Sequence, residues 1–170
     1  RDQRGRMQIL PAYWRECLRD KKETKGSMNP FEKITTSITA ADCNQGIKGF
    51  FPELTGIEFT QVTSDEVVAK ILLKPAFMAP NGFLHAGLVV TLADTDCAWG
   101  TRMHMNPEAK GLTTIELKTN FLSTINEGII SATATPLHVG RKTQVWDAVV
   151  KSEKSGKVMA HFRFTQMILY

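Results

Sequence analysis

The sequence has few cysteines and no long apolar run. Cys17, Cys43 and Cys97 are scattered and odd in number, so neither a disulfide framework nor a zinc site is expected. The longest apolar stretches are interrupted by Asp94 or by polar alternation, well short of the roughly 20 residues that a membrane span needs. The N-terminus has arginines but no apolar segment of a secretory signal. These features favour a reducing compartment, and we expect a cytoplasmic location and no membrane partner.

Several motifs of catalytic chemistry are also missing. The chain has no Gly-x-Ser-x-Gly nucleophile elbow, no glycine-rich nucleotide loop, no Cys-x-x-Cys pair and no His-Glu-x-x-His zinc motif. These gaps argue against a serine hydrolase of the elbow type, a nucleotide-loop enzyme and a zinc peptidase. No metal site is predicted.

The positive charge of the chain is local. Residues 1–28 carry eight Lys and Arg against four Asp and Glu, whereas residues 29–170 carry thirteen of each. The formal net charge of +4 and the pI of about 9.0 are therefore weak evidence for nucleic-acid binding. No nucleic-acid partner is expected.

Length and composition predict one domain. The chain has 170 residues, and 42% of them are hydrophobic, which is enough for a sizeable core. Residues 1–28 end in a Gly-Ser breaker, and Met28 can itself begin a complete domain. We interpret residues 1–28 as an N-terminal extension, which is a leader added by cloning, an alternative upstream start or a functional arm. Residues 29–170 form the predicted domain.

The chain is organised around the stretch 81–96. It opens with the turn residues Asn81 and Gly82, and its apolar positions from residue 88 onward recur at helical spacing until Asp94 interrupts them. This predicted helix is apolar almost all round, so other elements should wrap it. A carboxylate in its middle is costly, and burial would raise its pKa. The alternative is an Asp94 that faces water or has a structural partner.

Strand patterns lie on both sides of this helix. Period-two alternation predicts two tightly connected antiparallel strands before it, at residues 57–62 and 67–73, and four strands after it, at 112–122, 129–138, 143–151 and 158–168. Pro30 at a plausible first helical turn and the helical spacing of Phe31, Ile34, Ile38 and Ala41 predict one or two helices before the sheet. The order predicts an α+β fold in which an antiparallel sheet of five to six strands wraps around one long central helix.

Helix geometry constrains any site that uses both His85 and Asp94. Nine residues along a helix place them roughly 13 Å apart on opposite sides. Such a site must therefore lie between two helices, most simply those of a symmetric dimer. Asp96 points about 200° around the helix from Asp94, so we expect a structural pairing for it instead of a place in the same pocket.

These motifs resemble a known family. The His-Ala-Gly and Ala-Asp-Thr sequences at 85–87 and 93–95, together with the strand patterns at 114–122 and 138–141, are similar to those of the PaaI-like acyl-CoA thioesterases, which have the hotdog fold. The resemblance covers about residues 50–168. It implies hydrolysis of an acyl-CoA thioester without a cofactor, since coenzyme A is part of the substrate. It also implies a homodimer, or a tetramer made of paired dimers, with active sites between subunits.

The resemblance assigns roles to the residues of the central stretch. Asp94 is the general base for water or the nucleophile, and the backbone N–H of Ala86, where the family has glycine, donates to the thioester oxygen. Gly87 contributes to substrate binding at the helix start. His85 orients this turn or polarises the carbonyl. Asn81 reaches the thioester or is only a turn residue, because relatives often carry their amide two residues earlier.

The remaining assignments concern the two ends of the substrate. Arg141 and Lys142, at a strand turn, are the candidates for the nucleotide phosphates, with Arg102 and Lys110 as weaker ones. The candidates for the walls of an acyl pocket, suited to an aromatic, branched or medium-chain group, are Phe50, Phe51, Phe77, Met78 and Trp99.

Two alternatives remain open. A hydratase or dehydratase acting on an acyl thioester would pair His85 with an acid. A catalytically silent acyl-CoA-binding module would keep the groove and use Asp94 only structurally.

Overall fold

The computed structural model describes residues 38–170. The chain forms, in order, helices α2 (Ala40–Gly46) and α3 (Phe51–Leu54), strands β1 (Glu58–Val62) and β2 (Val67–Leu72), the short 3₁₀ helix η1 (Pro75–Phe77), helix α4 (Ala86–Met103), and strands β3 (Gly111–Phe121), β4 (Ile129–Val139), β5 (Thr143–Ser152) and β6 (Val158–Leu169). The predicted strands and the central helix are all present. The N-terminal extension, residues 1–28, lies outside the described residues.

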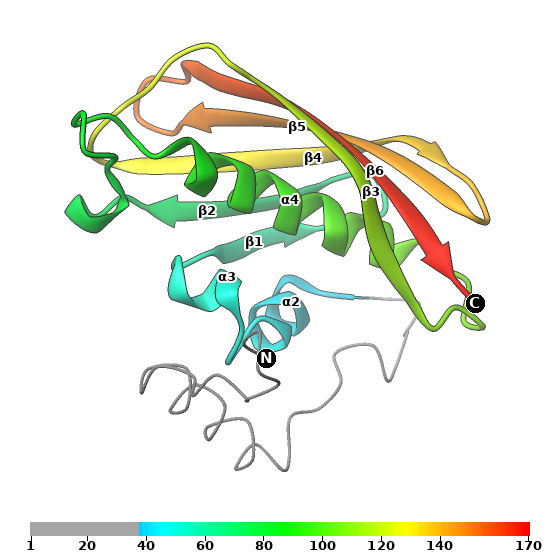
Figure 1. The fold of residues 1–170 in the computed structure, drawn as a ribbon. Helices are drawn as coiled ribbons and strands as arrows, with labels where there is room; N and C mark the ends of the chain where they lie inside the picture. The colour runs from blue at the N-terminus through cyan, green and yellow to red at the C-terminus, as the bar shows by residue number, and fades with distance from the viewer. Residues whose placement is uncertain (1–37) are drawn as a thin grey trace, which may run out of the picture. The chain divides into compact units, whose positions relative to one another are not determined.

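The six strands form one antiparallel sheet in the order β1-β2-β4-β5-β6-β3. Figure 1 shows the sheet curving over α4, which lies along its concave face. Inward-facing side chains alternate with outward-facing ones along β5 and β6, and the largest buried ones are Trp146 and Phe164. The predicted α+β arrangement, a sheet wrapped around one central helix, is confirmed. Among the described helices, none is both long enough and apolar enough to cross a bilayer.

Helix α4 is buried over most of its circumference. Ten of its 18 residues are buried, from Leu88 near its start to Arg102 in its last turn. Gly100 lets the sheet approach the helix closely, since a Cβ there would lie 2.5 Å from Cζ3 of Trp146. The Trp146 Nε1–H donates to Gln144 Oε1 (3.0 Å), and Gln144 Nε2 donates to the Thr101 carbonyl (3.3 Å). The end of the helix is thus fixed to the sheet by packing and by hydrogen bonds.

The first described helix, α2, begins with a capping box. Thr39 and Asp42 form a capping box in which the Thr39 hydroxyl accepts from the Asp42 N–H and the Asp42 carboxylate accepts from the Thr39 N–H. This cap starts α2 at Ala40, so Ile38 precedes the helix, and α2 and α3 confirm the predicted one or two helices before the sheet. Residues 30–37 of that predicted helical region lie outside the described residues.

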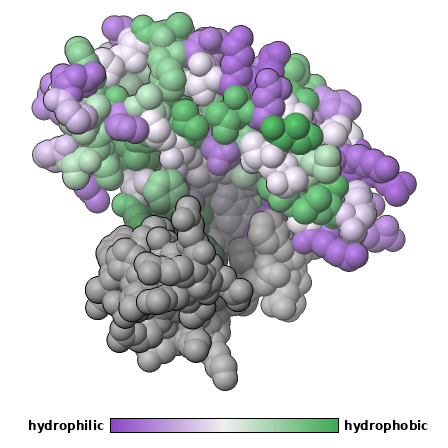
Figure 2. All heavy atoms as spheres, in the orientation of Figure 1, coloured by the Kyte–Doolittle hydropathy of each residue, from purple (hydrophilic) through white to green (hydrophobic). Residues whose placement is uncertain are grey.

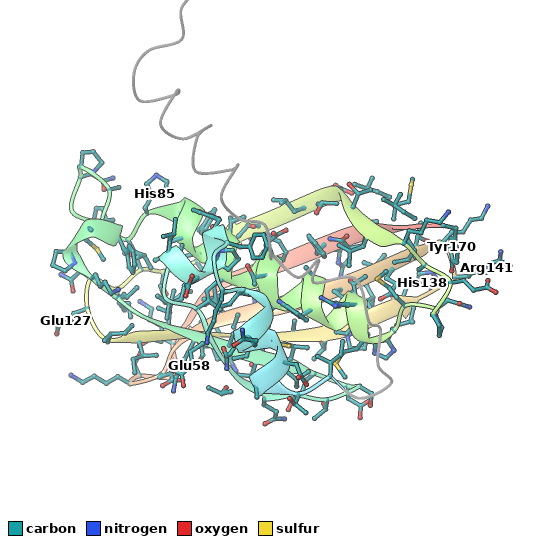
Figure 3. All side chains as sticks on the ribbon, turned by 90° about the horizontal axis from the view of Figure 1, so that it is seen from below. Glu58, His85, Glu127, His138, Arg141 and Tyr170 are labelled. Atoms are coloured by element: carbon teal, nitrogen blue, oxygen red, sulfur yellow. The ribbon has the colours of Figure 1, made fainter. Side chains whose placement is uncertain are left out.

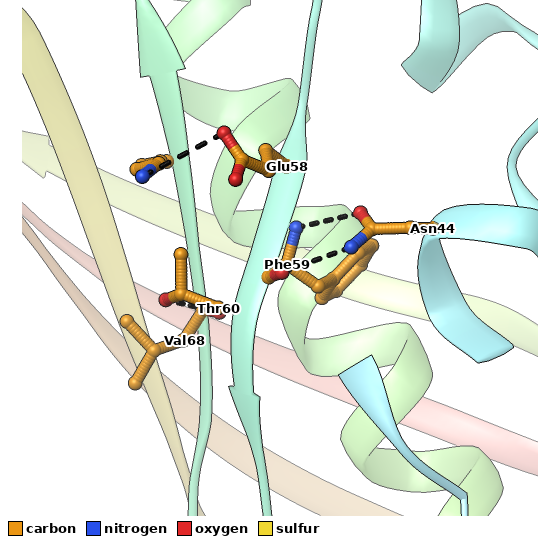
Figure 4. Close-up of polar contacts among 6 residues, drawn as sticks. Asn44, Glu58, Phe59, Thr60 and Val68 are labelled. Atoms are coloured by element: carbon orange, nitrogen blue, oxygen red, sulfur yellow. Dashed lines mark hydrogen bonds and ion pairs between the residues drawn. The ribbon is translucent and has the colours of Figure 1, made fainter. Parts of the chain in front are cut away.

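The two edges of the sheet differ. The Asn44 side chain of α2 covers β1, with its Nδ2 donating to the Phe59 carbonyl (2.9 Å) and its Oδ1 accepting from the Phe59 N–H (2.8 Å), as Figure 4 shows. Asn44 thus occupies the positions that a further strand would use. At the other edge, β3 is 11 residues long, and no strand of residues 38–170 pairs with its outer side.

We expect Asn44→Ala to destabilise the domain by about 1–3 kcal/mol, because it leaves the N–H and the carbonyl of Phe59 without partners at a partly buried position. Urea unfolding followed by circular dichroism measures the loss. The matched control is Gln45→Ala, on the exposed face of the same helix. Equal losses in the two variants would show that the Asn44 clamp adds nothing to stability.

Candidate active site

His85 holds the turn that starts α4. Its backbone N–H donates to the Phe77 carbonyl (3.0 Å), and its own carbonyl accepts from the Leu88 N–H (3.0 Å). Its side chain is the N-cap, with Nδ1 accepting from the Gly87 N–H at 3.0 Å. A neutral imidazole that accepts through Nδ1 carries its hydrogen on Nε2. The prediction that His85 orients this turn is confirmed, and its action on a carbonyl stays a prediction.

The two amides at the helix start are not equivalent. The Gly87 N–H is engaged by His85, whereas the exposed Ala86 N–H has no hydrogen-bond acceptor within residues 38–170. Unpaired N–H groups in the first turn of a helix carry its positive end and attract negative charge. Ala86 is therefore the amide that is available to a developing oxyanion.

Gly87 contributes space instead of a donor. A Cβ at Gly87 would lie 2.9 Å from Nδ1 and 3.0 Å from Cε1 of His85, so any side chain there would displace the imidazole. The substrate-binding role of Gly87 stays a prediction, and the sequence motif does not reveal that its N–H donates to the His85 imidazole.

Asp94 lies near the middle of α4 and is half-buried. Burial raises the pKa of its carboxyl above the usual value, and no opposing charge or hydrogen bond from another described residue lowers it. The structural partner considered in the sequence analysis is not found in this part of the chain. Asp94 and His85 lie nine residues apart, which along the helix is about 13 Å on opposite sides. Within one copy of the chain they cannot contact the same reacting atom.

Asp96 is fully buried on the side of α4 that faces the sheet. No described side chain pairs with its carboxyl oxygens, so the expected structural pairing is reduced to the backbone amide of Ala69. Burial raises the pKa of Asp96 well above its usual range, and the backbone amide of Ala69 lowers it only in part. The side chain faces the interior, where apolar side chains and strand backbone surround it, and the neutral acid is its stable form.

A groove with a volume of about 310 Å³ lies beside the start of α4. It is lined by α3, η1 and the first turns of α4, through Phe51, Thr55, Ala76, Phe77, Met78, His85, Gly87, Leu88 and Thr91. Three of the five predicted pocket residues line it. Phe50 does not, and Trp99 packs instead edge-on against Phe59, with ring centroids 6.0 Å apart.

Asn81 belongs to the loop before α4. Its Oδ1 accepts from the Phe83 N–H at 3.1 Å, and the next residue, Gly82, has a φ of +82°. Both features are those of a turn, so the interpretation of Asn81 as a turn residue is confirmed. Its contact with substrate stays a prediction.

The predicted phosphate-binding residues lie far from the helix start. Figure 3 shows His85 at one end of the domain and Arg141 at the other, on the turn between β4 and β5. Arg141 and Lys142 are exposed, and neither forms an ion pair with a described residue. Arg102 is only 8% exposed and lies over the ring of Trp99, so it is a poor candidate for binding phosphate. One copy of the chain therefore does not bring its own His85 and Arg141 into one site.

Comparison with known proteins identifies the family. The model of the Thioesterase superfamily matches residues 81–159, which include Ala86, Asp94 and Arg141. A 1,4-dihydroxy-2-naphthoyl-CoA hydrolase from Listeria monocytogenes is 30% identical over 101 residues, covering 59% of this chain and 81% of that protein. The chain belongs to the thioesterase superfamily. It is therefore an enzyme that hydrolyses thioesters, as the sequence predicts.

Solved structures agree with this assignment. A mutant thioesterase from Pseudomonas aeruginosa superposes with a TM-score of 0.74 at 25% identity, covering 78% of this chain and 95% of that one. A thioesterase from Haemophilus influenzae gives a TM-score of 0.73 at 27% identity, covering 78% and 92%. The predicted hotdog fold of this thioesterase is confirmed. Its place in the PaaI-like subfamily stays a prediction.

We expect the free energy of unfolding of the wild-type thioesterase to fall, relative to that of Asp96→Asn, as the pH rises above about 4. An unfolded Asp releases its proton near pH 3.9, whereas buried Asp96 keeps its proton in the folded state because its pKa is raised. Deprotonation therefore favours unfolding in the wild type only. Urea unfolding between pH 4 and pH 8 measures the difference. Glu153→Gln, at an exposed turn, is the control, and a difference between wild type and Asp96→Asn that does not vary with pH would contradict this assignment.

Proposed function

We propose that this thioesterase hydrolyses acyl-CoA thioesters in a site that two copies of the chain build together. The observation that carries the proposal is the placement of the free Ala86 N–H and the unpaired Asp94 carboxyl eight residues apart on one helix, about 12 Å along its axis. Thioester hydrolysis needs an amide at the carbonyl oxygen and a base at the attacking side of the same carbon. Asp94 of one copy and Ala86 of a second copy can meet this requirement.

The chemistry follows from these two groups. The Asp94 carboxylate takes a proton from water, which attacks the carbonyl carbon, or attacks that carbon itself to form an anhydride that water then hydrolyses. In both routes negative charge develops on the carbonyl oxygen, where the Ala86 N–H and the positive end of α4 stabilise it. The C–S bond then breaks, and coenzyme A leaves as the thiol with the free acid as the second product. His85 keeps the amide in place through its bond to Gly87.

Strand β3 provides the surface for a second copy. Its outer edge is unpaired in the described chain, and four large apolar side chains near it are 43–60% exposed: Ile115, Leu117, Phe121 and Leu122. Figure 2 shows exposed apolar side chains among the charged ones on the viewed face of the domain. Antiparallel pairing of two β3 edges about a twofold axis continues the sheet and sets the two α4 helices antiparallel. The Arg141 end of one copy then lies at the His85 end of the other, where it can bind the nucleotide phosphates.

The groove beside Gly87 is the proposed acyl site. Phe51, Phe77 and Met78 give it apolar walls, which suit an aromatic, branched or medium-chain acyl group. The aromatic acyl group in the name of the Listeria relative is consistent with this class. We also propose that two such dimers form a tetramer. A cytoplasmic location, expected from the sequence, is part of the same proposal.

We expect Asp94→Asn to lower kcat/KM by about 100-fold or more, because the amide can neither accept a proton nor attack the carbonyl. Thiol release from aromatic, branched and medium-chain acyl-CoAs measures the activity. Asp96→Asn, two residues along the same helix, makes the same substitution at a fully buried position and should retain turnover. The rate of the wild type should fall toward acid at a pH above the usual range of a carboxyl, since burial raises the pKa of Asp94.

Two other results would contradict this assignment. Acyl-CoA binding without thiol release by the wild type would favour the silent binding module. Loss of activity in His85→Ala but not in Asp94→Asn would favour hydratase chemistry.

We expect inactive Asp94→Asn and inactive Gly87→Ala proteins to restore activity to each other when mixed. Gly87→Ala displaces His85 in one copy, and Asp94→Asn removes the acid from the other. Each mixed dimer retains one complete site, so random exchange of subunits gives about one quarter of the wild-type activity. Native mass spectrometry verifies that mixed dimers form. Mixed dimers without activity would show that both groups act within one copy.

A further inference from the structure

Tyr170 contacts Arg141 in two ways. Its hydroxyl donates a hydrogen bond to the Arg141 carbonyl at 2.8 Å, and its ring centroid lies 5.5 Å from the guanidinium carbon of Arg141. Figure 3 shows both residues together at the end of the domain that lies away from His85. One side chain thus fixes the backbone of Arg141 and supports its charged group.

The turn that carries Arg141 is held firmly although it is exposed. The Gly140 N–H donates to the Thr143 carbonyl (2.9 Å), and the Ile168 N–H donates to the Lys142 carbonyl (2.8 Å). A Cβ at Gly140 would lie 2.6 Å from Nε2 of His138, so the turn also packs tightly on its inner side. The positions of the two adjacent cations are therefore set by β6 and not by the turn alone.

Three cations gather here without an acidic partner. The Lys110 N–H donates to the Leu169 carbonyl (2.8 Å), which places Lys110 next to Tyr170 in the sheet. Arg141, Lys142 and Lys110 are exposed, and none of them forms an ion pair with a residue of the described chain. A guanidinium held in a fixed orientation binds phosphate with two parallel hydrogen bonds. The chemistry of this cluster fits a phosphate group carried by a nucleotide.

We infer that Tyr170 is a positioning residue that holds Arg141 for a phosphate at the nucleotide end of the substrate, and that this cluster selects coenzyme A thioesters over thioesters of short thiols. The inference rests on the proposed function, since it concerns the distant end of the same substrate. Without Tyr170, Arg141 must be ordered when the substrate binds, and this cost weakens binding without affecting the reacting carbon.

The test compares one acyl group on three thiols: coenzyme A, its analogue without the 3′-phosphate, and N-acetylcysteamine. For the coenzyme A thioester, Tyr170→Ala should raise KM about three- to tenfold with kcat unchanged. Tyr170→Phe keeps the ring but loses the hydrogen bond, so its KM should lie between those of the wild type and Tyr170→Ala. All variants should hydrolyse the N-acetylcysteamine thioester at the rate of the wild type. Lys154→Ala removes an exposed charge from another turn and is the control for Arg141→Ala.

A double-variant cycle tests whether Tyr170 acts through Arg141. If it does, the protein with both Tyr170→Ala and Arg141→Ala should have the KM of Arg141→Ala alone. Additive effects, or an equal effect of Tyr170→Ala on all three thioesters, would overturn the inference and leave Tyr170 a purely structural role. Failure of the wild type to release thiol from any of the thioesters would instead overturn the proposed function.

Discussion

A single packed helix fixes where the proposed reacting groups of this thioesterase lie. The Ala86 amide and the Asp94 carboxyl are both part of α4, and packing of that helix against the sheet leaves no freedom to bring them together. The close packing of Gly100 against Trp146 and the hydrogen bond from Gln144 to the Thr101 carbonyl hold the C-terminal end of α4. The spacing of these groups along α4 is therefore set by the packing of the whole domain, and the proposal of a site shared by two copies rests on it.

The same helix places two aspartates in different surroundings only two residues apart. Asp94 is half-buried, whereas Asp96 is fully buried between α4 and the sheet. Burial raises the pKa of both carboxyls, but only Asp94 can reach water and a substrate. The raised pKa thus marks Asp94 as a candidate base, whereas at Asp96 it marks a cost to stability. The two residues differ because the side chain of Asp96 is fully buried and that of Asp94 is not.

Periodicity in the sequence predicted the six strands and the central helix, because strands such as β5 and β6 alternate buried and exposed residues and the apolar residues of α4 recur at helical spacing. The His-Ala-Gly motif also predicted that His85 orients the helix start. The sequence did not reveal that Asp96 lacks a side-chain partner or that Trp99 packs against Phe59, since both depend on which elements face α4. The groove draws its walls from α3, η1 and α4, and Tyr170 meets Arg141 across a strand and a turn. Such contacts between distant segments leave no local pattern.

The amide clamp of Asn44 on β1 has a consequence for assembly. A sheet with two exposed edges can add copies at both sides without limit, which is the geometry of a growing fibril. Here one edge is capped by a side chain of the same molecule, and β3 is the edge strand that residues 38–170 leave open. In the proposed dimer the two capped β1 edges are outermost, where the Asn44 side chains oppose the addition of a further strand.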